Sequence, residues 1–89
     1  MARDTDRKKI SEALRLQGMW RVEERDRTGV RLVTDFDERL SIAYGNADQI
    51  KFATYTHWDR DTGEIVSREP ITVAKRARVL HLINQGRGR

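Results

Sequence analysis

Residues 55–70 read YTHWDRDTGEIVSREP, and the fold depends on whether this stretch forms a metal site or a turn. His57, Asp59 and Asp61 alternate, as ligands on one face of a strand would. The Asp-Thr-Gly that ends this run is instead typical of a tight turn, with Gly63 in the left-handed conformation. A turn there stops the alternation and disperses the three side chains. The stretch therefore predicts a β-hairpin.

Two further features of the sequence argue against a metal site. A calcium loop that began at Asp59 would need an oxygen ligand at its fifth position and a bidentate Glu at its twelfth. Gly63 and Pro70 stand at those positions. The chain has no cysteine, which excludes thiolate zinc sites, disulfides and cysteine nucleophiles. We expect neither a metal nor another cofactor.

A second segment has the same turn chemistry. RDRTGV at 25–30 resembles DRDTGE at 59–64, and their glycines are 34 residues apart. The flanking segments do not match, so shared turn chemistry explains the likeness better than an internal repeat does. We expect Gly29, like Gly63, to take the left-handed position that closes a hairpin loop.

Hydrophobic periodicity places the remaining elements. Apolar residues at helical spacing predict a helix from Thr5 to Gln17, with Gly18 at its C-terminal end. Alternating segments predict five strands, the last of which stops at Pro70, and a closing helix follows Thr72. The predicted strands are 19–24, 30–36, 39–45, 50–58 and 64–69, and the second helix is 73–85. The expected fold is α+β, one small domain at 1–85 with an antiparallel sheet of four or five strands, followed by a flexible basic Gly/Arg tail at 86–89.

The strand at 50–58 presents two sets of aromatic side chains. Phe52 and Trp58 share one parity, and Tyr55 and His57 share the other. We expect Phe52 and Trp58 to enter the core with Trp20. Tyr55 and His57, if they lie on an open sheet face, would be candidates for stacking on unpaired bases. The competing interpretation packs Tyr55 at the edge of the core.

Helical spacing in the C-terminal segment predicts one buried face and one charged face. The expected buried residues are Val73, Ala77, Leu80 and Ile83. Leu82 would then lie among Lys75 and Arg78 on the opposite face, with Val79 at the border. An apolar pair in that position suggests contact with a protein partner or a second copy of the chain through Val79 and Leu82.

Composition limits the class of protein. The 89 residues are 37% hydrophobic and 36% charged, which is compatible with one folded domain that buries roughly two-thirds of its surface. No apolar run approaches the roughly 20 residues that cross a bilayer. We expect a cytoplasmic protein that does not contact a membrane.

Catalytic motifs are weak. The serines lie in no nucleophile-elbow context, and the glycines form no phosphate-binding loop. A nuclease that used His57 with Arg68 ranks last among the functional hypotheses. We expect a protein that is not an enzyme.

Charge is the strongest functional signal. The chain carries a net charge of +4, with basic ends and an acidic middle. The C-terminal 20 residues contain no acid, and their bases are Lys75, Arg76, Arg78, Arg87 and Arg89. Arginine binds phosphate in a bidentate manner, so this segment predicts contact with DNA or RNA. The favoured hypothesis is a small regulatory or accessory protein of bacterial or phage type that binds nucleic acid through its C-terminal helix and tail. The alternative is a protein-binding adaptor or inhibitor that docks or self-associates through the same helix.

Overall fold

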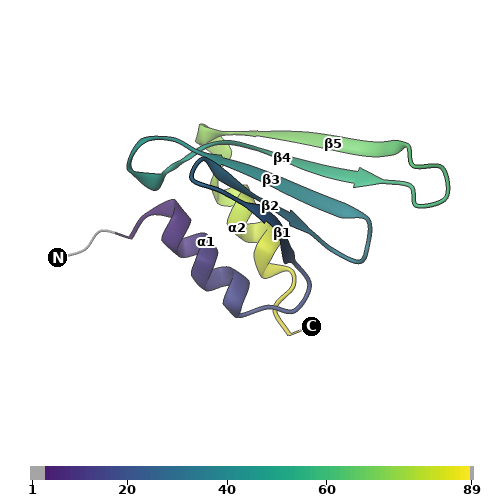
Figure 1. The fold of residues 1–89 in the computed structure, drawn as a ribbon, viewed down its shortest axis with the longest axis horizontal. Helices are drawn as coiled ribbons and strands as arrows, with labels where there is room; N and C mark the ends of the chain where they lie inside the picture. Colours follow the sequence, from purple (N-terminus) through teal and green to yellow (C-terminus); the bar gives the residue numbers. More distant parts are fainter. Residues whose placement is uncertain (1–3, 89) are drawn as a thin grey trace.

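The computed structural model describes residues 4–88 as one helix, five strands and a second helix in chain order (Figure 1). The helices are α1 (Asp6–Arg15) and α2 (Ala77–Asn84). The strands are β1 (Arg21–Arg25), β2 (Gly29–Val33), β3 (Glu38–Tyr44), β4 (Ile50–Trp58) and β5 (Ile65–Thr72). Short 3-10 turns, η1 (Asn46–Asp48) and η2 (Val73–Lys75), precede β4 and α2. The predicted α+β architecture is confirmed.

The five strands form one antiparallel sheet in sequence order, from β1 at one edge to β5 at the other. Both helices lie on the same face of this sheet, as Figure 1 shows. The core fills the space between the two layers, and its most deeply buried side chains are Ile10, Leu32, Leu40, Ile71, Val79 and Ile83. The opposite face of the sheet has no covering element among residues 4–88, and we call it the open face.

Side-chain caps define helix α1. Thr5 accepts a hydrogen bond from the backbone N–H of Lys8 at 3.1 Å, which satisfies one of the free donors at the start of the helix. At the other end, the amide of Gln17 donates to the carbonyls of Leu14 and Trp20. Gln17, rather than the predicted Gly18, therefore completes the helix terminus and connects it to the sheet.

Strand β5 continues past the residue at which the sequence predicted its end. Pro70 pairs with Thr54, and the strand runs on to Thr72. Because β5 is an edge strand, the missing N–H of Pro70 costs no bond within the sheet. The predicted termination at Pro70 was wrong because the sequence does not show which strand lies at the edge.

One of the two sets of side chains on β4, that of Phe52 and Trp58, lies outside the core that was predicted for it. Ala53 is buried beneath the helices and Tyr55 packs against the core, whereas Phe52 is 52% exposed on the open face. The pairing of β3 with β4 is irregular between Ala43 and Tyr44, so that Ile50 is buried although it shares the parity of Phe52. This irregularity changes the alternation along the strand. The prediction that Phe52 and Trp58 fill the core was therefore wrong, whereas Tyr55 packs at the edge of the core, as the interpretation that competed with base stacking expected.

The predicted phase of the last helix was also wrong. Residues 73–75 form a 3-10 turn, and the α-helix begins only at Ala77. Val73 is exposed, while Val79 and Leu82 are 0% and 2% exposed in the core. A 3-10 turn has fewer residues per turn than an α-helix, so counting at 100° per residue from Val73 misplaces the buried face.

The ends of the two helices meet at Gly86. This residue is buried, and its carbonyl accepts a hydrogen bond from Gly18 N–H at 3.2 Å. The packed chain thus extends through Gly86, the first residue of the predicted tail. No helix among residues 4–88 has the length and apolar content needed to cross a bilayer.

Candidate nucleic-acid interface

The fold gathers the two basic ends of the chain into one layer. Segments 4–18 and 73–88, which contain both helices, hold eight basic and three acidic residues. The intervening segment, 19–72, which contains the sheet, holds eight basic and eleven acidic residues. A net charge of +5 in the helical layer therefore lies against −3 in the sheet layer. Because the helices contact each other on one face of the sheet, charges that are far apart in sequence share one surface.

Five exposed cations define what we call the basic helical surface. They are Lys9, Arg15, Lys75, Arg76 and Arg87. With the exception of Arg76, none of them forms an ion pair with a carboxylate of the described residues. Lys9 and Arg76 line a groove of about 130 Å³ between the two helices. Long exposed cations on both sides of a groove suit contact with phosphates.

Arg76 is linked to the start of α1. Its Nε lies 3.8 Å from a carboxylate oxygen of Asp6, which is itself buried and accepts the backbone N–H of Ile50 at 2.7 Å. Asp6 thus connects the first turn of α1 to the start of β4 and to Arg76, the residue between η2 and α2. The guanidinium of Arg76 remains about half exposed.

Arg78 points to the other side of α2. Its guanidinium makes two hydrogen bonds, of 3.0 and 3.2 Å, to the carboxylate of Glu69 on β5. This bidentate pair lowers the pKa of Glu69 and raises the pKa of Arg78. Because its charge is matched by Glu69, we leave Arg78 outside the basic helical surface.

The remaining predicted phosphate-binding residues lie at the C-terminus. Arg87 is exposed and directly follows Gly86, which packs between the helix ends. Arg89 lies outside the described residues. Lys9 and Arg15 were not among the predicted site residues, although the basic N-terminal segment indicated them, because only the fold brings α1 beside α2.

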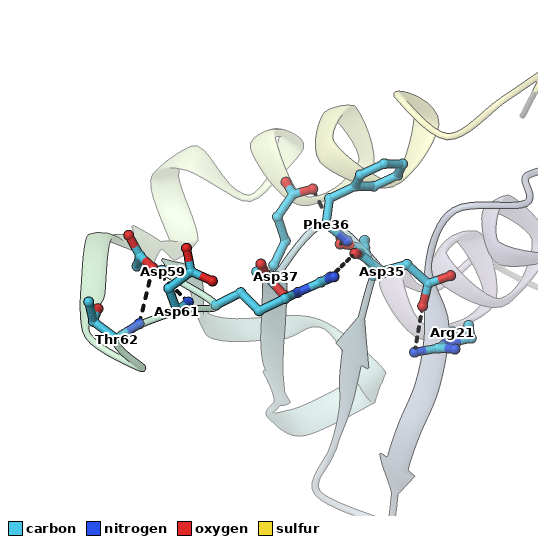
Figure 2. A network of polar contacts seen from close by, with 10 residues as sticks. Arg21, Asp35, Phe36, Asp37, Asp59, Asp61 and Thr62 are labelled. Carbon is cyan, nitrogen blue, oxygen red and sulfur yellow. Dashed lines mark hydrogen bonds and ion pairs between the residues drawn. The ribbon is translucent and has the colours of Figure 1, made fainter.

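The structure of the β4–β5 turn decides whether His57, Asp59 and Asp61 form a metal site or belong to a turn. The carboxylate of Asp59 accepts hydrogen bonds from the backbone N–H groups of Asp61 and Thr62, at 2.8 and 3.2 Å (Figure 2). Gly63 has a φ of +74°, as the turn prediction required. Among residues 4–88, no three His, Asp or Glu side chains are grouped so as to hold a metal ion. The carboxylate of Asp59 is thus part of the turn.

The acidic residues near this turn contact arginines from other elements. Arg60 donates to the carboxylate of Asp37 at 3.1 Å and to the backbone carbonyl of Asp35 at 2.6 Å. Arg21 at the start of β1 pairs with Asp35 at 3.1 Å, as Figure 2 shows. These contacts join the β2–β3 loop to the β4–β5 loop. They stabilise the loops and leave no free cluster of carboxylates.

The first turn differs from its prediction. Asp26 accepts hydrogen bonds from the N–H groups of Thr28 and Gly29 and from the Thr28 hydroxyl, which lowers the pKa of its carboxyl group. Gly29, however, belongs to β2 and does not have a positive φ. A Cβ on Gly29 would lie 2.2 Å from the carbonyl oxygen of Ile42. Close approach of β2 to β3, and not a left-handed turn, is the reason for glycine here.

Tyr55 is part of a polar cluster on the helix-covered face. Its ring packs edge-on against Trp20, with 6.5 Å between ring centroids, and its hydroxyl donates to Glu38. Burial and this bond to a carboxylate raise the pKa of Tyr55 to about 12. Tyr55 is therefore not available for stacking on a base.

His57 and Arg68, the candidate nuclease pair, project from opposite faces of the sheet. His57 shares the face of Tyr55 and pairs with Glu38 and Ser67 on the neighbouring strands. Arg68 pairs with Thr56, whose side chain lies on the open face. The geometry does not bring His57 and Arg68 together.

The residues of the predicted protein interface lie in the core. Val79 and Leu82 pack with Ile83 under the sheet and are shielded from solvent. A partner could contact either residue only if α2 moved away from the sheet. The interface prediction was wrong for the same reason as the helix phase.

Comparison with protein-family models, with curated proteins and with solved structures returns no match.

Proposed function

We propose that this chain is a small non-enzymatic module of regulatory or accessory type, which binds nucleic-acid phosphates through the basic helical surface. The observation that carries the proposal is the segregation of charge between the two layers. A net charge of +5 in the helical layer attracts a polyanion to that side, whereas the sheet layer as a whole carries −3. The binding site is thus local to α1, η2 and α2.

Phosphate contacts from this surface account for most of the binding energy. Three to five such contacts release a similar number of condensed counterions, so the slope of log affinity against log salt is roughly −3 to −4. Lysine and arginine contacts to phosphate carry no sequence information. The module therefore binds many DNA or RNA sequences with similar affinity. It acts in the cytoplasm as an accessory protein of bacterial or phage type.

Fluorescence anisotropy with labelled duplexes at several salt concentrations tests this proposal. The double variant Lys75→Ala/Arg87→Ala removes two cations of the basic helical surface. Its salt slope should be shallower than that of the unmodified chain by about 1.8, because each phosphate contact contributes about 0.9.

The matched control is Arg27→Ala/Lys51→Ala, which removes the same charge from two exposed residues of the sheet layer. It should keep the slope of the unmodified chain. Equal losses in both double variants would show that net charge alone drives binding, and a salt-independent affinity would rule out phosphate contacts altogether.

A further inference from the structure

The open face presents a row of arginines beside aromatic rings. Strand pairing places five residues across the sheet in one row, from β1 to β5, and they are Arg21, Val33, Arg39, Thr56 and Arg68. Side chains in one row of an antiparallel sheet lie on the same face. Arg31 on β2 belongs to the next row, opposite Ser41. Four arginines therefore project from the face that the helices leave uncovered.

Trp58 and Phe52 supply the rings. Both belong to β4. Phe52 shares the parity of Thr54 and Thr56 on the open face, and the contact of Trp58 with Arg39 places its ring on that face too. The guanidinium of Arg39 lies over the ring of Trp58, with 5.4 Å between its carbon and the ring centroid. The two rings are six positions apart along the strand, which at about 3.3 Å per residue is about 20 Å. One flexible strand can thus contact both rings through different bases.

Phe52 borders a shallow depression in the open face, of about 370 Å³. Its floor includes Gly29, Ala43 and Ser41, whose small side chains leave the backbone of β2 and β3 accessible. Phe52 itself is 52% exposed. A flat ring seated on this floor would contact the ring of Phe52 and lie close to Arg31, which also lines the depression.

Charge on the open face favours an anionic ligand. Among the described residues, Glu23 and Glu24 on β1 both pair with Arg31, and Asp35 of the β2–β3 loop pairs with Arg21. Glu23 also lies 3.7 Å from Arg39. The Arg39 side chain is nevertheless 41% exposed. Arg68 is exposed and forms no ion pair among the described residues, so Arg68 and the exposed part of Arg39 can contact a phosphate.

We propose that the open face binds unpaired bases of single-stranded nucleic acid. Phe52 and Trp58 stack on bases, and Arg39 and Arg68 contact the phosphates between them. The two rings do not form a continuous apolar patch of the kind that marks protein interfaces, because hydroxyl side chains, Thr54 and Thr56, separate them on the same strand. This site lies opposite the basic helical surface and does not depend on it.

Fluorescence anisotropy tests the proposal by comparing the affinity for a labelled thymine oligonucleotide of roughly 12 nucleotides with the affinity for an abasic strand of the same length. The unmodified chain should bind the thymine strand more tightly. Phe52→Ala and Trp58→Ala should each weaken binding to the thymine strand by about tenfold, because a stacked base contributes about 1–3 kcal/mol, and should leave abasic binding unchanged. Phe36→Ala is the control, since Phe36 is 56% exposed but belongs to the β2–β3 loop.

Tryptophan fluorescence supplies a measurement that does not depend on loss of affinity. Saturating thymine strand should quench the emission of the unmodified chain, and this quenching should largely disappear in Trp58→Phe, because the remaining Trp20 is buried. Quenching that is unchanged in Trp58→Phe would overturn the proposal. Equal affinity for thymine and abasic strands would do so too and would direct the search to a protein partner. If Lys75→Ala/Arg87→Ala abolished binding to both strands and the two ring variants had no effect, the strands would bind only to the basic helical surface. That result would also overturn the proposal.

Discussion

Trp20 donates its indole N–H to the backbone carbonyl of Leu82 at 2.9 Å and so joins the residue before β1 to the C-terminal helix. Trp20 is only 4% exposed, and Gly86 N–H bonds to Ile83 instead of Leu82. The indole is therefore the partner of a buried carbonyl near the helix end. This bond spans 62 positions of the chain and holds the helical layer against the sheet.

Trp20→Phe should destabilise the domain by about 1–3 kcal/mol, because the Leu82 carbonyl stays buried and loses its donor. Urea unfolding measures this change. Trp58→Phe is the control, since that ring lies on the open face outside the core and should shift stability far less. Equal effects of the two substitutions would contradict a special role for the indole bond.

Leu82→Ala should cost about 2–5 kcal/mol of unfolding free energy, as removal of a fully buried leucine side chain does elsewhere. Leu16→Ala should change stability by less than about 0.5 kcal/mol, because Leu16 is 60% exposed. Thermal denaturation compares the two variants directly. If Leu82→Ala left the melting temperature unchanged, the packing of α2 described above would be incorrect.

Gly29→Ala should destabilise the sheet by about 1–3 kcal/mol, since the new Cβ would lie 2.2 Å from the Ile42 carbonyl oxygen and the strands would have to separate. Gly45→Ala is the matched substitution. There the nearest atom is the Cβ of Lys51 at 3.5 Å, an ordinary contact. Urea midpoints should fall for Gly29→Ala and change little for Gly45→Ala, and the reverse order would contradict the register of β2 and β3.

The Glu69–Arg78 pair should make stability depend on pH in the acid range. Arg78 lowers the pKa of Glu69 below 4.5 in the folded state, so the contribution is complete above pH 4.5 and is lost as the pH falls through the lower folded value. The two side chains are 37% and 42% exposed, and screening limits the contribution to a few tenths of 1 kcal/mol, up to about 1.

Urea unfolding of Glu69→Gln and the unmodified chain from pH 3 to pH 7 measures this dependence. The difference in unfolding free energy should be constant at neutral pH and should shrink in acid. Glu64→Gln removes an exposed carboxylate that forms no ion pair among the described residues and should show no such dependence. A difference that grows as the pH falls would have the wrong sign for this pair.

The sequence alone determined the order of elements and the chemistry of the second turn. Thr5 caps α1, Gly63 closes the β4–β5 turn, and alternating apolar residues form strands, because each of these features depends on neighbours a few positions away. Charge at the two ends was equally evident. The prediction that the basic ends bind nucleic acid stays a prediction.

Tertiary structure decided which side chains face solvent. The irregular pairing beside Tyr44 placed Phe52 on the open face and Tyr55 beneath the helices, and the 3-10 turn before α2 turned Leu82 into the core. Each shift of one residue exchanges buried and exposed positions, because side chains alternate along a strand and rotate by 100° along a helix. Only the packing of the two layers selects between these alternatives, since burial of Leu82 and Ala53 depends on contacts with residues far away in sequence.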